Sequence, residues 1–292
     1  MKKRYVYAGL TVVIWSTMAA IVKSLLNNMP DMQALSLSSF LAFFFLLLLN
    51  LCNGAVKRMR QYSLGDYGKM AGLGFLGMFL YSALYYYGID QLTSQQACVL
   101  NYLWPMMLVL FSCLILKEKL TLMKIVAMVC SFVGIVILTS GINAGAGSGN
   151  ITVGIVSCVV AAACYGLFSV LNKKADYDQE IAMMVIWLTA AVCALLTGLF
   201  TEQWISVTGG QWLGLLWLGV VIDAIAYLLW ALAINGSENT AAIANMAYLV
   251  PFLSLLVSAV FLKEKIELRA VAALIFIVGG ILMQSIYGAK KQ

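Results

Sequence analysis

The stretch Asn101-Tyr102-Leu103-Trp104-Pro105-Met106-Met107 decides the fold, because a related stretch follows 146 residues later as Ala247-Tyr248-Leu249-Val250-Pro251-Phe252-Leu253. Each copy lies in an apolar segment that ends in a charged motif. The motif is Lys117-Glu118-Lys119-Leu120 in the first half and Lys263-Glu264-Lys265-Ile266 in the second, again 146 residues apart. The chain is therefore a duplicated unit.

Composition places the chain in a lipid bilayer. Its residues are 63% apolar and only 10% charged, and its mean hydropathy is +0.95, whereas soluble domains are about 45–50% apolar and about 25% charged. A membrane-spanning helix needs about 20 mostly apolar residues. We therefore predict an all-α integral membrane protein of the cell membrane with ten transmembrane helices, over residues 5–26, 32–51, 70–89, 97–116, 125–142, 151–171, 181–200, 212–234, 240–262 and 270–286.

The predicted repeats are inverted relative to each other. Each half, 1–142 and 151–292, would hold five helices, and an odd number of helices starts the second copy from the opposite side of the membrane. The Gly-rich and Ala-rich stretch 141–149 is the predicted linker. Inverted repeats are typical of alternating-access transporters, in which the ligand lies near the bilayer midplane.

Basic residues predict the orientation. Fourteen of the 18 Lys and Arg residues fall on the side of the N-terminus, so the positive-inside rule makes both termini cytoplasmic. The net charge of +6 is then an insertion signal, and no nucleic-acid partner is expected. Lys23 and Lys173 lie near helix ends, where long basic side chains commonly extend to the lipid headgroups.

Missing residue types argue against an enzyme. The chain has no His, which excludes His-based metal sites, Ser-His-Asp triads and His proton relays. The seven Cys residues have no C-x-x-C spacing and are interpreted as packing residues. Residues 72–77 match G-x-G-x-x-G without a preceding strand, so these glycines are predicted to allow close helix contact. No metal or other cofactor is expected.

Helical projection predicts which side chains face the bundle interior. Tyr81 and Tyr85 share a stripe with three glycines in the third span. The eighth span carries Asp223 and Tyr227 on one stripe, and Tyr227 follows Tyr81 by 146 residues. Phenol groups are costly to leave unsatisfied in lipid, so these stripes should line the interior. Ordinary aromatic packing between helices is the alternative.

The duplicated motif supplies the remaining candidates. Asn101, Tyr102 and Trp104 lie beside Pro105 in the fourth span, and Tyr248 and Pro251 are repeat counterparts in the ninth. A proline inside a span frees a backbone carbonyl and bends the helix, so both prolines are candidate hinges or gates, or kinks that serve packing alone. Matched aromatic positions 150 residues apart in spans one and six add Trp15 and Tyr165.

These features resemble the drug/metabolite transporter superfamily, and specifically its EamA-type ten-helix members. The resemblance rests on the ten spans, the inverted repeat and the Leu-Lys-Glu-Lys motif, and it covers essentially the whole chain. Residues 101–105, followed by Leu108-Val109-Leu110-Phe111-Ser112, are most similar to the aromatic amino acid exporters. This resemblance implies that six side chains face the substrate: Tyr81, Ser82, Tyr85, Tyr102, Trp104 and Tyr165.

The predicted function is secondary active transport by alternating access. No phosphate-binding loop is present, so a gradient of substrate, protons or ions must supply the energy. An aromatic cavity with a few polar groups suits a small amphipathic metabolite, namely an aromatic or neutral amino acid that is exported. Export of organic cations or other drug-like compounds through cation–π contacts is the second possibility, and a non-transporting scaffold, assembly factor or lipid-handling enzyme is a third.

Asp223 is the only carboxylate deep in a predicted span. A buried charge there needs a partner, a cavity or a proton, so Asp223 is a candidate for substrate binding and for proton coupling. The expected partners of the protein are its small-molecule substrate and the lipid bilayer. It is expected to be a monomer or a weak homo-oligomer.

Overall fold

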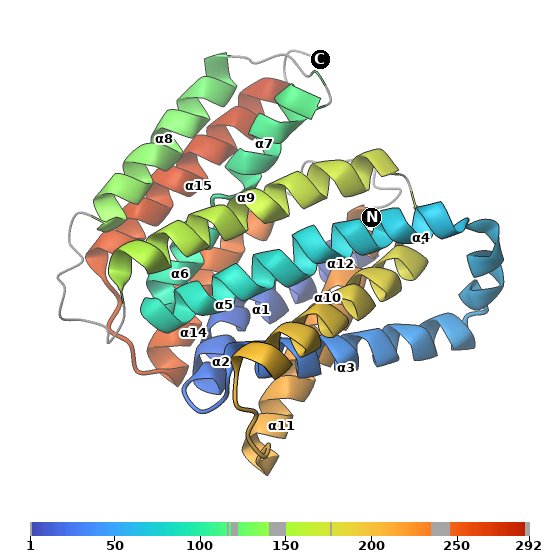
Figure 1. The fold of residues 1–292 in the computed structure, drawn as a ribbon. Coiled ribbons are helices and arrows are strands. Elements are labelled where there is room, and N and C mark those ends of the chain that lie inside the picture. The colour runs from blue at the N-terminus through green and yellow to red at the C-terminus, as the bar shows by residue number, and fades with distance from the viewer. Residues whose placement is uncertain are drawn as a thin grey trace.

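The computed structural model describes residues 2–115, 117, 122–139, 150–175, 177–234 and 246–289, and within these ranges it contains helices and connecting turns but no strand (Figure 1). The first half contains α1 (Lys2–Ser16), α2 (Met18–Leu26), α3 (Asp31–Cys52), η1 (Ala55–Gln61), α4 (Leu64–Gly74), η2 (Phe75–Leu80), α5 (Tyr81–Gln91), α6 (Ser94–Asn101), α7 (Trp104–Ile115) and α8 (Leu122–Thr139). The second contains α9 (Ile151–Ala175), α10 (Gln179–Thr201), α11 (Gly209–Leu216), η3 (Trp217–Ala226), α12 (Tyr227–Ile234), η4 (Ala247–Leu249), α14 (Val250–Phe261) and α15 (Leu268–Ala289).

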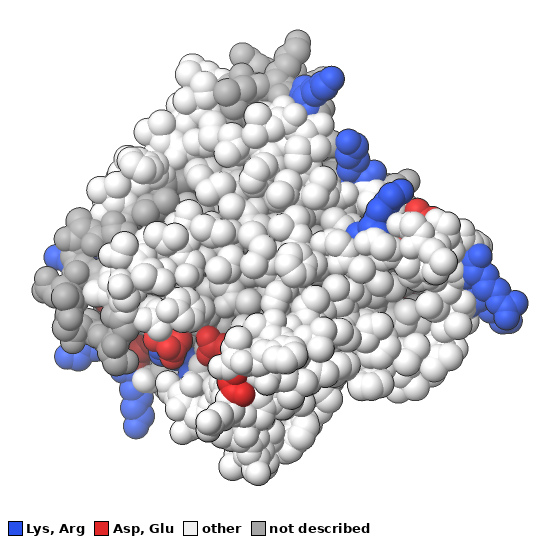
Figure 2. Space-filling model, in the orientation of Figure 1, with Lys and Arg blue, Asp and Glu red and all other residues white. Residues whose placement is uncertain are grey.

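The helices have the length and composition of membrane spans, which confirms the predicted all-helical membrane class. Six described stretches are long and apolar enough to cross a bilayer: Lys3–Leu26, Asp31–Cys52, Ser94–Ile115, Ile151–Asn172, Gln179–Thr201 and Gly209–Trp230. Two shorter apolar helices, Val250–Phe261 and Leu268–Gly280, accompany them. The total of ten spans stays a prediction. Figure 2 shows uncharged surface across the middle of the molecule, with charged side chains toward two opposite ends.

Helices of one half pack mainly against helices of the other. α3 runs along α10 and α8 runs along α15 (Figure 1). Several other contacts come in pairs that the repeat relates. The packing of α5 on α9 corresponds to the packing of α12 on α1. Likewise, α7 packs on α9 in the same way that α14 packs on α1 and α2. A duplicated unit that packs against its own copy explains this reciprocity.

Irregular backbone recurs at matched positions of the two halves. The helical stretch that contains Tyr81 is π-helical over 75–80, and the one that contains Tyr227 is π-helical over 217–226. The two described non-glycine residues with a positive φ are Lys117 at 56° and Lys263 at 55°, the first residues of the two charged motifs. A left-handed residue ends a helix and turns the chain back on itself.

The charged motif of the second half forms hydrogen bonds with the first half. After the turn at Lys263, the carboxylate of Glu264 accepts hydrogen bonds from the Ser94 backbone N–H at 3.1 Å and from its hydroxyl at 2.8 Å. Ser94 begins α6, and a carboxylate is favourable at a helix N-terminus. The corresponding residue of the first half, Glu118, lies outside the described residues.

Two expectations about local packing need correction. Close contact is confirmed for Gly74, where a Cβ would lie 2.6 Å from the Ile186 carbonyl oxygen, but it is wrong for Gly72, which faces open space. The prediction that Lys23 extends to the headgroups is also wrong. Its Nζ donates to the carbonyl oxygens of Ile89, Asp90 and Leu92 at 2.6, 3.2 and 3.0 Å, because the last carbonyls of α5 lack helical partners.

Candidate substrate-binding site

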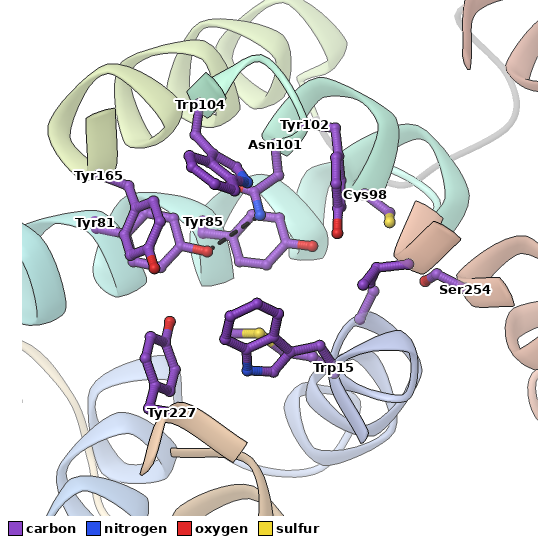
Figure 3. A pocket seen from close by; sticks show the side chains of 13 residues that line it. Trp15, Tyr81, Tyr85, Cys98, Asn101, Tyr102, Trp104, Tyr165, Tyr227 and Ser254 are labelled. Atoms are coloured by element: carbon purple, nitrogen blue, oxygen red, sulfur yellow. Dashed lines mark hydrogen bonds between the residues drawn. The ribbon is translucent and has the colours of Figure 1, made fainter. Parts of the chain in front are cut away.

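A cavity of about 50 Å³ lies near the middle of the bundle, between segments of both halves (Figure 3). The long helices through this region place residues from the centre of each segment around it. The cavity is lined by Trp15, Met18, Ala19, Tyr81, Tyr85, Cys98, Asn101, Tyr102, Trp104, Tyr165, Tyr227, Val250 and Ser254. None of these side chains is charged. Seven of them are Tyr or Trp residues that the sequence predicted to line the interior, as it predicted Asn101.

Asn101 is the central polar group of the wall. Its Nδ2 donates to the Tyr81 hydroxyl at 3.1 Å (Figure 3). Its Oδ1 is buried and has no hydrogen-bond partner among the described residues. A buried amide oxygen without a donor is costly, so this atom can accept a hydrogen bond from a bound solute at a net gain.

Aromatic rings surround that amide. The Tyr81 ring stacks on Tyr85 with centroids 5.9 Å apart, and the Tyr165 ring lies 5.0 Å from Tyr81 and 5.2 Å from Trp104. The hydroxyl of Tyr227 points toward that of Tyr165 (Figure 3). Such rings offer both flat apolar faces and hydroxyl groups to a solute.

Trp15 closes the opposite wall. Its ring contacts Tyr227 and Trp230, with centroid separations of 5.2 Å in both cases. The indole Nε1 of Trp15 is buried and finds no acceptor among the described residues. Two lining residues therefore carry a buried polar atom without a partner, the donor Trp15 Nε1 and the acceptor Asn101 Oδ1.

The two proline motifs meet at this cavity. α6 ends at Asn101 and α7 begins at Trp104, whereas α14 begins at Val250, directly after η4. Pro105 and Pro251 thus lie in the first turns of new helices, where a missing N–H is tolerated, rather than in the middle of bent ones. The side chain of Pro105 lies outside the described residues, and that of Pro251 is buried.

Tyr102 satisfies a carbonyl that Pro251 leaves without its helical donor. In a regular helix the N–H of residue 251 would donate to the carbonyl of Ala247, and proline has no N–H. The Tyr102 hydroxyl donates to this carbonyl oxygen at 3.2 Å, and the Val250 N–H donates to it as well. A side chain of one repeated motif thereby binds the backbone of the other.

The structure brings together most of the predicted site. Of the eleven predicted substrate-binding residues, Trp15, Tyr81, Tyr85, Asn101, Tyr102, Trp104, Tyr165 and Tyr227 line the cavity. Ser82 and Asp223 are buried but do not line it. The side chain of Tyr248 lies outside the described residues.

Asp223 lies behind the cavity wall. It is only 2% exposed and lies near Ser38 of α3, while its Oδ2 has no partner among the described residues. A separate cavity of about 20 Å³ is lined by Asp223 and Tyr227 among others. Because Tyr227 lines both cavities, it stands between the carboxyl group and the central one.

Sequence reasoning did not single out Met18, Ala19, Cys98, Val250 or Ser254 as site residues, although all five line the cavity. Some signal for them exists. Met18 follows Trp15 by three positions and Ser254 follows Pro251 by three, so each shares a helix face with a residue that was singled out. Cys98 likewise lies one turn before Asn101, but its residue type suggested packing.

Comparisons with known proteins agree with a duplicated helical membrane protein. The EamA-like transporter family matches residues 2–140 and 152–286. The chain belongs to this family, as the resemblance in sequence implied, and is thus a multi-pass membrane transporter.

Several curated relatives are similar along much of the chain. An uncharacterized transporter of Clostridium kluyveri is 26% identical over an alignment that spans 100% of this chain and 95% of the relative. The aromatic amino acid exporter YddG of Ancylobacter novellus is 30% identical over an alignment that spans 71% of this chain and 72% of the exporter. A solved crystal structure superimposes with a TM-score of 0.71 at 20% identity and covers 99% of both chains, which shows the same fold.

Proposed function

We propose that the protein is a secondary active exporter of aromatic or other neutral amino acids. The observation that carries this proposal is the pairing of a spare acceptor, Asn101 Oδ1, with a spare donor, Trp15 Nε1, in walls made of aromatic rings. An amino acid carries an ammonium donor and a carboxylate acceptor on one carbon. Its side chain would stack on the faces of Tyr81, Tyr85 and Trp104.

Two observations favour an amino acid over an organic cation. A cation would use the aromatic faces but leave the Trp15 N–H unpaired, and no lining residue is a carboxylate that could balance its charge. The relative from Ancylobacter novellus is named an exporter of aromatic amino acids, which supports the same choice. Export of organic cations is the second candidate because the aromatic walls also suit it.

Transport by this cavity requires that its walls move. A volume of about 50 Å³ is far below the roughly 300 Å³ or more that sites for small organic ligands occupy. We infer that the five-helix halves, 1–142 and 151–292, rock against each other to open the cavity to either side. Inverted repeats supply the two equivalent arrangements that such movement needs.

Uptake and counterflow in proteoliposomes test the substrate. Vesicles preloaded with unlabelled phenylalanine, leucine or a quaternary ammonium compound would be mixed with the same labelled solute. We expect counterflow of the amino acids, and about tenfold weaker counterflow in Asn101→Ala because the amide no longer binds the ammonium. Counterflow of the quaternary ammonium compound alone would establish the second candidate, and a lack of counterflow with every solute would contradict both.

The orientation belongs to the same proposal. With both termini in the cytoplasm, Lys57 faces the cytoplasm and Lys265 faces the outside. This orientation puts the greater number of basic residues on the cytoplasmic side. Single cysteines at Lys57 and Lys265, in a protein otherwise free of cysteine, should react with a membrane-impermeant maleimide from opposite sides. Reaction of both from one side would refute the inverted repeat. The same preparation would show whether the transporter is a monomer or a weak homo-oligomer.

A further inference from the structure

A second, open groove lies between α4 and α9, at the end of the bundle where α4 begins and α9 ends. Its volume is about 490 Å³, and it is separated from the central cavity by Phe168, whose ring packs on Gly77 and against Tyr165. The groove is lined by Lys69, Gly72, Leu73, Leu76, Leu171, Lys174, Ala175 and Tyr177. The central site does not use any of these residues.

The groove changes from cationic to apolar along its length. Lys69 and Lys174 lie on opposite walls near the helix ends. Leu76 lies seven residues further along its helix than Lys69, or about 10 Å deeper at 1.5 Å per residue. Gly72 has nothing within 4 Å of where a Cβ would be, so it leaves room in the wall between them. The groove therefore has a charged end and an apolar end.

The two ammonium groups remain available to a ligand. Lys69 Nζ lies 3.7 Å from Asp66, and its side chain is 72% exposed. Asp66 is already engaged by the backbone N–H and hydroxyl of Ser63, at 3.1 and 2.7 Å, and by Tyr177 at 3.4 Å. Lys174 is exposed and forms no ion pair with any carboxylate in the described part of the chain.

We propose that this groove binds an anionic glycerophospholipid of the adjacent leaflet, which is the cytoplasmic one in the orientation proposed above. The phosphate lies between Lys69 and Lys174, and one acyl chain runs past Gly72 along Leu76 and Leu171. Basic pockets between transmembrane helices bind anionic headgroups in this way, and a tyrosine such as Tyr177 is typical of the membrane interface. A free phosphate ion would leave the leucine-lined part of the groove uncovered.

A groove at the opposite end of the bundle supports this assignment by contrast. It has a volume of about 340 Å³ and is lined by Thr17, Ala20, Ile21, Ser24, Trp217, Val257, Phe261 and Leu262. Ile21 and Ser24 precede Leu171 and Lys174 by 150 residues, the offset that also relates Trp15 to Tyr165. The duplicated fold thus forms a groove at each end, and only the one beside α4 carries cations.

Native mass spectrometry of the full chain tests the proposal. The protein would be released from nanodiscs that contain equal amounts of phosphatidylglycerol and phosphatidylcholine. We expect wild type to retain phosphatidylglycerol at least about tenfold more than phosphatidylcholine, and the double variant Lys69→Gln/Lys174→Gln to lose this preference, since each lysine strengthens binding to an anionic surface several-fold. The variant Lys57→Gln/Arg60→Gln is the matched control. It removes the same charge at the same end of the bundle but outside the groove, and it should keep the preference.

Three results would overturn the proposal. If the control variant lost the preference for phosphatidylglycerol equally, general electrostatic attraction to the leaflet and not the groove would hold the lipid. Displacement of phosphatidylglycerol by 10 mM inorganic phosphate would make the groove a site for a free anion. A wild-type protein without preference would have no such site. Because the variants are exposed substitutions, equal melting temperatures in phosphatidylcholine would show that each variant is folded.

Discussion

The two halves of the central cavity share an aromatic framework but not their polar chemistry. Trp15 is matched by Tyr165, and Tyr81 is matched by Tyr227, at the repeat offsets of 150 and 146 residues. All four rings line the cavity. Both copies of the duplicated unit therefore carry large rings at the positions where the two halves meet.

The polar groups differ between the halves. Asn101 and Trp104 of the first half stand where the second has Ala247 and Val250. Conversely, Asp223 of the second half stands where the first has Gly77, and Gly77 packs against Phe168. The polar groups proposed to bind the solute thus lie in the first half, and the buried carboxyl group lies in the second. We infer from this difference that binding and coupling are divided between the halves.

The largest effect is expected at Trp104. Trp104→Ala removes one wall of the aromatic cage and should abolish counterflow, and Tyr85→Ala should do the same, because binding by stacking needs these faces. Val250→Ala is the matched control, since it changes the equivalent position of the second half. We expect it to reduce counterflow no more than about twofold. Equal losses at Trp104 and Val250 would remove the functional difference between the halves.

A loss of coupling is expected at Asp223. The Asn variant keeps the shape of the side chain, but it cannot release a proton. We expect Asp223→Asn to stop accumulation driven by a pH gradient while substrate exchange continues near the wild-type rate. Fluxes measured with and without an imposed gradient separate the two activities. Unchanged pH dependence would make Asp223 a structural residue and place coupling elsewhere.

A smaller effect is expected where the two proline motifs meet. Tyr102→Phe leaves the Ala247 carbonyl without its side-chain donor and should slow transport several-fold, since one hydrogen bond contributes about 1 kcal/mol. Pro251→Ala restores the backbone N–H that this carbonyl lacks. Tyr102→Phe should therefore slow transport less in a Pro251→Ala background than in the wild type. A double-mutant cycle measures the difference. Additive effects would show that the hydroxyl and the proline act independently.

Most of the site could be predicted from the sequence because its aromatic residues follow helical periodicity and the internal repeat. Tyr81 and Tyr85 follow from helical projection, and Tyr227 follows from Tyr81 by the repeat. Sequence could not reveal the π-helical turns before Tyr81 and Tyr227, because they depend on packing against other helices. The role of Lys23 was missed for the same reason, since its acceptors at Ile89–Leu92 lie more than sixty residues away in sequence.

The smallest effect is expected at Tyr86, which helical projection alone would place away from the site together with its neighbour Tyr87. The structure separates them. Tyr87 is 43% exposed, whereas Tyr86 is 1% exposed and lies near Ser38, as Asp223 does. Tyr86→Phe removes a buried hydroxyl near Ser38 and Asp223 and should shift the pH dependence of transport with at most about a twofold change in maximal rate. Tyr87→Phe is the matched control and should leave both unchanged. If the two variants behave alike, the Tyr86 hydroxyl near Ser38 does not contribute to coupling. The division of roles between the halves would then rest on Asp223 alone.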